Sequence, residues 1–298
     1  MIKLLIISDD FTGALDTGVK FSAAGARTRV STDTQIDFRQ EIAEEVLVLC
    51  APTRHLPPRE AYDMIRSIAQ RAVAAHIGCV YKKTDSALRG NIGAELSAVL
   101  DGSGEKCLSF IPALPGMNRI TVDGVHYIDG VPVDQSVFGQ DPFEPVTESR
   151  VPDLLHLQCD VPVKVISPEE LDSFRPGEEK CIYLFDCASR EDMEREAQRL
   201  YLLGCLKLLA GCAGLAESLP GYLGLRMGEK PQCRIEANRL MVLCGSVNPI
   251  SCSQMDYGEQ RGYRRVHIPA DRLLSGGKFN TGSDAMMMDY LWTLYCQT

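Results

Sequence analysis

Side chains that could do chemistry are concentrated in residues 81–96, which read YKKTDSALRGNIGAEL. An apolar run of strand length precedes this polar segment, and apolar positions at helical spacing follow it. Between them lie ammonium, carboxylate, hydroxyl, guanidinium and amide groups, on Lys82, Lys83, Asp85, Ser86, Arg89 and Asn91. Ligands of open α/β sheets bind outside the carboxyl ends of the strands, so this strand end is a candidate binding site for an anion. The alternative is a solvated loop followed by a helix cap.

A second polar strand end lies near the amino terminus, where Ser8, Asp9 and Asp10 follow the apolar run 2–7. Two adjacent carboxylates on a rigid support suit Mg²⁺ capture or deprotonation of a substrate hydroxyl. Thr12 and Gly13 indicate the start of a helix, and Thr12 is itself a candidate N-cap. The alternative is that one aspartate caps the helix and the other is solvated. Two polar strand ends in one chain favour the functional interpretation of both.

These strand ends require a sheet to position them. Apolar runs of strand length alternate with longer amphipathic segments, which predicts an α/β fold with a mainly parallel sheet flanked by helices. The expected strands cover residues 2–8, 27–31, 46–51, 79–83, 107–111, 181–186, 205–209, 240–244 and 264–268. The expected helices cover residues 13–24, 58–76, 92–101, 190–203, 213–225 and 250–261.

Two segments depart from this alternation. Residues 112–152 are rich in glycine and proline and are expected to form a long irregular excursion with room for a small hairpin. Loops of that length are usually functional or disordered. The polar, helix-breaking stretch 227–238 marks the expected boundary between two domains, residues 1–228 and 239–298. Just before the boundary, the small residues of 210–219 allow close approach of a ligand or of another helix.

Composition and charge exclude several classes of function. The chain has 298 residues, of which 45% are hydrophobic and 24% charged, which is ordinary for a globular protein. Its 31 basic residues are scattered and outnumbered by 40 acidic ones, so a nucleic-acid partner is disfavoured. No apolar stretch approaches the roughly 20 residues of a membrane span, and no secretory signal precedes Asp9. We expect a cytoplasmic protein with small-molecule partners.

The twelve cysteines contain no C-x-x-C pair. Several lie in short apolar runs that are typical of strands, namely Cys50, Cys79, Cys107, Cys181 and Cys244. Free cysteine is among the most buried residue types, so these residues are expected to be structural thiols rather than metal ligands.

Five motifs, in order, resemble the four-carbon acid sugar kinase family of the DUF1537 type. They are DDFTGALDTG (9–18), KKTDSALRGNIGAEL (82–96), the run from PALPGMNRITVDGVHYIDGVPV (112–133) through DPFEPV (141–146), AGCAGLAESL (210–219) and CGSVNP (244–249). The chain differs from the usual family pattern at Ala87, where the family has threonine, and at Asn118, where it has glycine before the arginine.

The resemblance implies transfer of the γ-phosphoryl group of ATP to a hydroxyl of a threonate, an erythronate or a 2-oxo derivative, with Mg²⁺. It implies catalytic roles for Asp10 and Asp85, sugar-acid binding by Asp9, Lys82, Lys83, Ser86, Arg89, Asn91 and Arg119, and ATP contacts from Gly245 and Ser246. The excursion would then be a flap over the substrate, carrying Arg119 and His126.

Arg89, assisted by Lys82 or Lys83, is the expected partner of the substrate carboxylate, because a guanidinium matches a carboxylate with two hydrogen bonds. Asp85 or Asp10 is expected to accept the hydroxyl proton, while the other orients sugar hydroxyls or holds Mg²⁺.

The resemblance also divides the chain by function. Residues 1–228 are expected to be the sugar-acid domain and residues 239–298 an incomplete α/β nucleotide-binding domain, since the glycines at 276 and 277 lack the spacing of a phosphate loop. We therefore expect weak ATP binding, little kinase activity, retained sugar-acid binding and a tendency to self-associate through an exposed sheet edge. Two alternatives are a homologue that binds a sugar acid without transferring phosphate, and a dehalogenase-like phosphatase, which would need D-x-D-x-[TV] instead of adjacent acids.

Overall fold

The computed structural model describes residues 2–40, 43–141, 144–229, 240–242, 244 and 249–266. The chain divides into two compact units, residues 1–231 and 232–298. In the second unit the structure describes one helix, α7 (Pro249–Gln260), where the sequence predicts a helix over residues 250–261. The assignment of a sugar-acid domain and a nucleotide domain to residues 1–228 and 239–298 stays a prediction.

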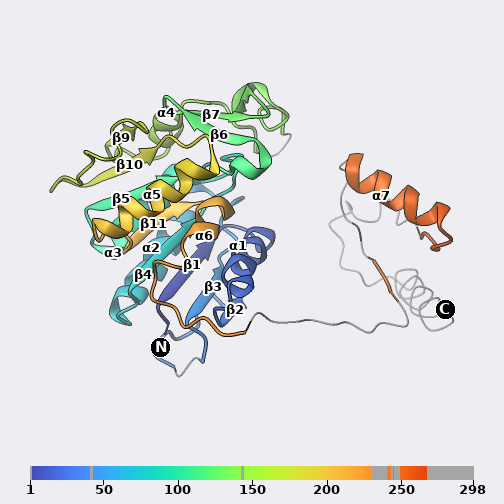
Figure 1. The fold of residues 1–298 in the computed structure, drawn as a ribbon, viewed down its shortest axis with the longest axis horizontal. Coiled ribbons are helices and arrows are strands. Elements are labelled where there is room, and N and C mark those ends of the chain that lie inside the picture. Colours follow the sequence, from blue (N-terminus) through green and yellow to red (C-terminus); the bar gives the residue numbers. More distant parts are fainter. Residues whose placement is uncertain are drawn as a thin grey trace. The chain divides into compact units, whose positions relative to one another are not determined.

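An eight-stranded parallel sheet forms the centre of the first unit (Figure 1). Its strand order is β2-β3-β1-β4-β11-β5-β10-β9. The strands are β1 (Leu4–Ser8), β2 (Thr28–Ser31), β3 (Val46–Cys50), β4 (Cys79–Lys83), β5 (Cys107–Ile111), β9 (Val163–Ile166), β10 (Cys181–Phe185) and β11 (Leu208–Gly211). The predicted fold class, a mainly parallel sheet flanked by helices, is confirmed.

Helices cover both faces of the sheet (Figure 1). The helices α2 (Pro58–Ala74), α3 (Ile92–Ser103) and α4 (Val151–His156) share one core with Leu5 and Ile7. The helices α1 (Phe11–Ala23), α5 (Arg190–Leu202) and α6 (Ala213–Ser218) share the other core with Leu4 and Ile6. Alternate residues of a strand point to opposite faces, so both faces of β1 must be apolar in a sheet that is covered twice.

The excursion is more regular than the sequence predicts. It contains a small antiparallel sheet of β6 (Arg119–Val122), β7 (Val125–Ile128) and β8 (Val131–Pro132). Tight turns join these strands at Asp123-Gly124 and Asp129-Gly130, where all four residues have positive φ. Asp and Gly tolerate that conformation, which explains why a segment rich in them forms hairpins instead of an irregular loop.

Several predicted boundaries were wrong. The helix expected over residues 213–225 ends at Ser218, because Pro220 has no backbone N–H to donate to the preceding turn. The strand expected over 205–209 lies at Leu208–Gly211, and the sequence missed α4 and β9. The described parts of the expected strands 240–244 and 264–268 have no strand assignment.

Four of the five cysteines predicted to lie in strands do so, whereas the prediction was wrong for Cys244, which is exposed and has no strand assignment. All ten described cysteines are free thiols, and Cys50, Cys79, Cys107 and Cys181 lie in strands of the sheet. Among the described residues, no helix has the length and apolar character needed to cross a bilayer.

The small residues of 210–219 provide close backbone packing. A Cβ on Gly211 would lie 2.4 Å from the carbonyl oxygen of Ile111, and one on Gly214 would lie 2.5 Å from that of Ala113. The strand β11 and the start of α6 therefore approach β5 and the loop after it more closely than any larger residue would allow.

Substitution of Gly211 tests this packing. Gly211→Ala should lower the free energy of unfolding by about 1–3 kcal/mol, because the new methyl group meets rigid backbone. The control is Gly78→Ala, where the nearest atom to the new Cβ would be the Lys3 carbonyl oxygen at 3.6 Å. The measurement is urea unfolding of both variants. Equal free energies of unfolding for Gly211→Ala and Gly78→Ala would contradict the close packing of Gly211.

Candidate functional site

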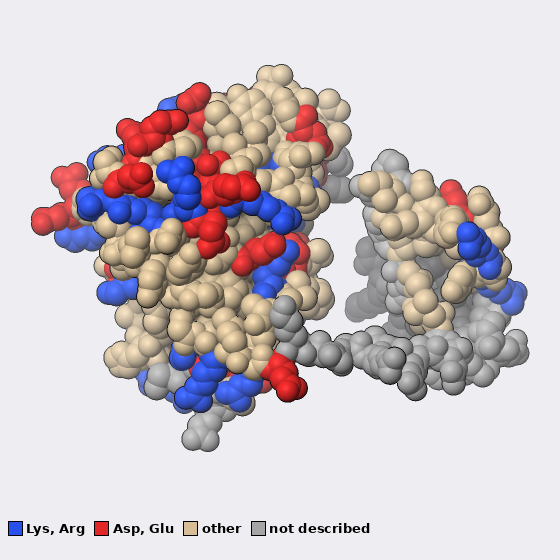
Figure 2. Space-filling model, in the orientation of Figure 1, with Lys and Arg blue, Asp and Glu red and all other residues tan. Residues whose placement is uncertain are grey.

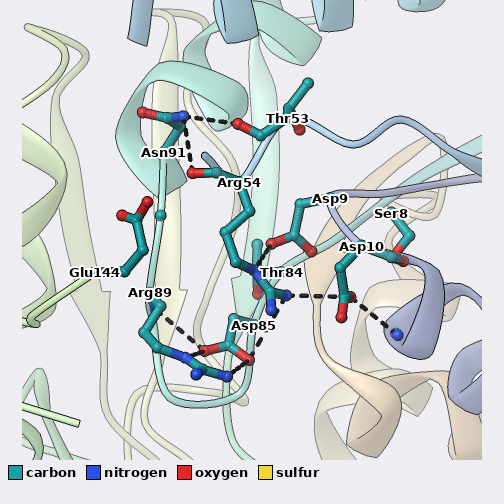
Figure 3. Close-up of polar contacts among 12 residues, drawn as sticks. Ser8, Asp9, Asp10, Thr53, Arg54, Thr84, Asp85, Arg89, Asn91 and Glu144 are labelled. Atoms are coloured by element: carbon teal, nitrogen blue, oxygen red, sulfur yellow. Dashed lines mark hydrogen bonds and ion pairs between the residues drawn. The ribbon is translucent and has the colours of Figure 1, made fainter. Parts of the chain in front are cut away.

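The loops that follow three neighbouring strands meet at one edge of the sheet (Figure 3). Asp9 and Asp10 come from the loop after β1, Arg54 from the loop after β3, and Asp85 and Arg89 from the loop after β4. The order β3-β1-β4 makes these loops neighbours, as expected for the carboxyl ends of parallel strands. Both polar strand ends predicted from the sequence thus form one cluster.

Arg54 lies at the centre of this cluster (Figure 3). Its Nε is 2.7 Å from Asp9 Oδ2, and its Nη2 is 3.1 Å from Asp10 Oδ1 and 3.8 Å from Asp85 Oδ1. Burial acts to lower the pKa of Arg54, but the surrounding carboxylates outweigh burial and raise it. One guanidinium therefore neutralises part of the charge of three aspartates.

Arg54 is not among the site residues predicted from the sequence. The loop that carries Arg54 contains no recognisable motif. The sequence indicated Arg54 only by its position shortly after the predicted strand 46–51. Gly90 gives a second signal in the structure, since a Cβ at that position would lie 2.9 Å from Arg54 Cγ. The glycine of the polar segment thus leaves room for the arginine of another loop.

Asp10, not Thr12, is the N-cap of α1. Its Oδ1 accepts a hydrogen bond from the Gly13 backbone N–H at 2.9 Å, and its backbone is extended as N-caps require. Asp9 is 2% exposed, and its Oδ1 has no hydrogen-bond partner among the described residues. The two adjacent aspartates therefore differ: Asp10 has 27% of its side chain exposed, whereas Asp9 is buried against Arg54.

Asp85 is held by Arg89 from its own loop. Arg89 Nε is 2.7 Å from Asp85 Oδ2, and Arg89 Nη2 is 3.3 Å from Asp85 Oδ1. Burial would raise the pKa of Asp85, but the hydrogen bond from Arg89 and the charges of Arg54, Arg89 and Lys83 lower it to about 2. Arg89 Nη1 also reaches Asp141 Oδ2 at 3.2 Å. The expected carboxylate partner Arg89 is thus engaged by two carboxylates of the chain.

Lys82 and Lys83 point to opposite faces of the sheet. Lys82 is fully buried, and its Nζ is 2.7 Å from Glu95 Oε2 on α3. Lys83 lies on the side of α1, where its Nζ would be 2.7 Å from a Cβ on Gly13. Lys82 therefore supports the site from inside the core, and its expected role at the substrate stays a prediction.

The Lys82–Glu95 pair supports the loop that carries Arg54. The Thr53 hydroxyl donates to Glu95 Oε1, so the residue before Arg54 is anchored on the buried pair. Asn91 adds three hydrogen bonds from its Nδ2, to Thr53 O at 2.9 Å, to Leu56 O at 2.8 Å and to Arg54 O at 3.4 Å. Asn91 therefore fixes this loop through its Nδ2 (Figure 3), and its predicted role in substrate binding stays a prediction.

The excursion brings Arg119 to the same edge. Its guanidinium donates to the Ser86 hydroxyl, and its Cζ lies 5.3 Å from the centre of the Phe138 ring. The Cζ of Arg89 lies 5.1 Å from the same ring, so Phe138 contacts both guanidiniums. Among the described residues, no carboxylate forms an ion pair with Arg119.

His126 of the excursion is a structural residue. It is fully buried between Ser86 O, 3.0 Å from its Nε2, and the Thr121 hydroxyl, 3.1 Å from its Nδ1. Burial lowers the pKa of His126 to about 4, so the ring is neutral at pH 7. We expect it to hold the loop after β4 and not to exchange protons with a substrate.

The sequence matches a known protein family. The model of the sugar-binding N-terminal domain family matches residues 4–219. The chain belongs to this family. All of the cluster described above lies within the matched residues.

Curated relatives of this chain are named as kinases. It is 30% identical over 284 residues to a protein of Salmonella typhimurium named D-threonate kinase, covering 92% of this chain and 65% of the relative. It is 28% identical over 271 residues to a protein of Heliobacterium modesticaldum named D-erythronate kinase, covering 86% of this chain and 60% of the relative. The chain thus spans less than two thirds of the length of these relatives.

A solved structure from Bordetella bronchiseptica resembles the fold of this family member with a TM-score of 0.64 and 30% sequence identity. The similarity covers 73% of this chain and 55% of that one. That protein is described as a domain of unknown function (DUF1537), a domain-swapped dimer with bound citrate.

Other candidate features lie elsewhere in the first unit or outside the described residues. Gly245 and Ser246, predicted to contact ATP, are not among the residues that the structure describes. A groove of about 540 Å³ lies beside α2 and α3 and includes Arg59, Tyr62 and Lys180 in its lining, but none of the clustered residues above. On the face of the first unit in Figure 2, basic and acidic side chains are interspersed, unlike a nucleic-acid-binding surface.

The pH dependence of stability tests the assignment of Asp85. Because the folded protein lowers the pKa of Asp85 from 3.8 to about 2, the stabilisation is complete above the unfolded value and is lost as the pH falls through the folded one. Asp85→Asn should therefore cost about 2 kcal/mol of unfolding free energy at pH 7, at ~1.4 kcal/mol per pKa unit. This difference from the wild type should shrink between about pH 4 and pH 2.

Asp153→Asn is the matched control, since Asp153 pairs with Arg150 at 3.1 Å with 53% of its side chain exposed. Exposed pairs contribute little, so this variant should change the stability by less than about 1 kcal/mol. Denaturant unfolding across the pH range is the measurement. A cost for Asp85→Asn that stays constant down to pH 2 would show that the carboxylate is not stabilised by its arginines.

Proposed function

We propose that the charged cluster binds a four-carbon sugar acid, and that the chain is the substrate-binding part of an ATP-dependent kinase that phosphorylates a hydroxyl of that acid. The observation that carries the proposal is the convergence of Arg119, Arg89 and three aspartates at one sheet edge. A sugar acid needs a cation for its carboxylate and acceptors for its hydroxyls. The kinase names of the relatives and the citrate in the Bordetella neighbour support the same ligand class.

Arg119 is our choice for the partner of the substrate carboxylate. Arg54 is committed to Asp9 and Asp10, and Arg89 to Asp85 and Asp141. Arg119 has a hydroxyl and an aromatic ring as neighbours, so its charge is the one that an incoming carboxylate would compensate best. This choice revises the expectation from the sequence, which favoured Arg89.

Asp10 is our choice for the group that accepts the hydroxyl proton. Asp85 has a pKa of about 2 and both oxygens bound by Arg89, so it is a weak base and suits the orientation of sugar hydroxyls. Asp10 keeps more of its carboxylate exposed and is fixed by the helix N–H and by Arg54. It can therefore receive a proton without leaving its position.

In this proposal the described residues bind the sugar acid, which is the acceptor of the phosphoryl group. Among them, no group of three or more His, Cys, Asp or Glu side chains is arranged to hold a metal ion. The aspartates of the cluster are instead paired with arginines. We therefore assign no Mg²⁺ ligand to the described residues and derive no step through the metal. Self-association is also part of the proposal, since the citrate-bound neighbour is described as a domain-swapped dimer.

Substitution of Arg119 tests the carboxylate assignment. Arg119→Ala should weaken D-threonate binding by about 100-fold, equivalent to ~2.7 kcal/mol for a charged, bidentate contact. Arg119→Lys should recover part of the affinity, because it keeps the charge and loses the planar fork. Isothermal titration calorimetry on the full chain is the measurement, with D-erythronate as a second ligand.

Arg59→Ala is the control, since Arg59 has 79% of its side chain exposed and pairs with Asp63 on the same helix. It removes the same charge and should leave D-threonate binding unchanged. Wild-type affinity in Arg119→Ala would rule out Arg119 as the carboxylate partner. A coupled ADP-release assay then tests for turnover: turnover would support a kinase that is active in this chain, whereas binding without turnover is expected both of a substrate-binding part and of a sugar-acid-binding homologue.

A further inference from the structure

The guanidinium of Arg119 has few contacts that fix its orientation. It donates to the Ser86 hydroxyl, and its Cζ lies 5.3 Å from the centre of the Phe138 ring. Among the described residues, no carboxylate pairs with it. One hydrogen bond to a hydroxyl leaves a planar group on a long side chain free to tilt, because a hydroxyl accepts from several directions. The Phe138 ring is therefore the contact that can fix the plane of this guanidinium.

The same ring lies beside a second cation. Arg89 Cζ is 5.1 Å from the ring centre, and cations within about 6 Å of a ring centroid are attracted by the negative face of the ring. Arg89 belongs to the loop after β4 and Arg119 to β6, so Phe138 brings together guanidiniums from two separate elements. Because like charges repel, the ring also offsets part of the cost of placing both at one edge of the sheet.

The loop that carries Phe138 holds the ring in place. The Phe138 N–H donates to Ser136 Oγ at 3.1 Å, and the Phe138 carbonyl oxygen accepts from the Val146 N–H at 3.0 Å. The ring packs against an apolar cluster of four buried residues, Ala87, Ile128, Val133 and Val146. Ala87 lies in the loop that carries Arg89, and Ile128 is the register partner of Arg119. The ring is thus packed against the elements that carry both arginines.

The two arginines depend on the ring to different extents. Arg89 is also held by the carboxylates of Asp85, at 2.7 Å, and of Asp141, at 3.2 Å. Without the ring, these two ion pairs would still fix its position. For Arg119 the remaining contact would be the hydrogen bond to the Ser86 hydroxyl. Removal of the ring should therefore disturb Arg119 more than Arg89.

We propose that Phe138 is a positioning residue of the site, whose ring fixes the Arg119 guanidinium in the orientation that receives the carboxylate of the ligand. The ring contacts no ligand atom in this proposal and acts through Arg119. Naming the ligand as a sugar acid rests on the proposed function, whereas the support of Arg119 by the ring does not. A carboxylate makes two parallel hydrogen bonds with one orientation of the guanidinium, so fixing that orientation in advance lowers the entropic cost of binding.

Substitution of Phe138 tests the proposal by calorimetry of D-threonate binding to the full chain. Phe138→Leu keeps an apolar side chain and removes the ring, and it should weaken binding about five- to tenfold. Phe138→Tyr keeps the ring and should bind within about twofold of the wild type. In the Arg119→Ala background, Phe138→Leu should cause no further loss, because the ring then has no guanidinium to position.

Fluorinated phenylalanines at position 138 separate the electrostatic role of the ring from its shape. One, two or three fluorines on the ring withdraw charge from its face in steps and leave the packing nearly unchanged. The affinity for D-threonate should therefore fall with each added fluorine. A ring that merely filled space would give equal affinities across the series, and that result would overturn the proposal.

Two control variants remove apolar groups elsewhere. Phe38→Leu removes a ring that lies 5.0 Å from Arg71 Cζ, which is the same kind of pair outside the cluster. Val137→Ala changes the residue next to Phe138, whose side chain is exposed. Both variants should bind D-threonate as the wild type does.

A measurement without ligand separates this proposal from the proposed function. In NMR spectra of arginine-labelled protein, the ring current of Phe138 should shift the δ-proton and Nε–H resonances of Arg119, which the Arg119→Ala spectrum identifies. Phe138→Leu should abolish that shift. If it does so and D-threonate fails to bind the wild type, the support of Arg119 stands and the proposed function alone is overturned. Equal Arg119 resonances in the wild type and Phe138→Leu, or an undiminished effect of Phe138→Leu in the Arg119→Ala background, would overturn the positioning role.

Discussion

The position of one guanidinium, that of Arg54, makes the polar edge of this sheet possible. Asp9, Asp10 and Asp85 approach the same point from two loops, and Arg54 has a nitrogen within 4 Å of each. Two like charges 4 Å apart at an effective dielectric constant of about 20 repel by roughly 4 kcal/mol. Without a shared cation, the aspartates would separate or take up protons, and the edge would lose the anionic oxygens that a sugar hydroxyl requires.

The core of the sheet fixes where that guanidinium lies. Glu95 on α3 is held by Lys82 of β4 and in turn accepts from Thr53, so a buried ion pair anchors the Arg54 loop. Ion pairs of this kind are poor sources of stability, since well-packed apolar residues often do as well. Their advantage here is geometric: the pair links α3, β4 and the loop after β3 at the point where the site begins.

The sequence predicted the parts of the site that are contiguous in the chain. Asp85 and Arg89 stand four residues apart after an apolar strand, and a parallel sheet places such a segment at its carboxyl edge. Arg54 could not be predicted, because its role depends on the strand order β3-β1-β4, which the periodicity of the chain does not encode. The opposite directions of Lys82 and Lys83 follow from strand alternation and were within reach of the sequence. Their different surroundings, Glu95 on α3 for Lys82 and Gly13 on α1 for Lys83, depend on how two separate helices are placed in space.

The central claim is that this cluster, and not another surface of the first unit, receives the sugar acid. A crystal structure of the chain with D-threonate tests it most directly. The account predicts the ligand carboxylate on Arg119, a ligand hydroxyl at Asp10, and Arg54 still bound to Asp9 and Asp10. D-threonate bound in the groove beside α2 and α3, lined by Arg59 and Lys180, with the cluster empty and unchanged, would contradict it.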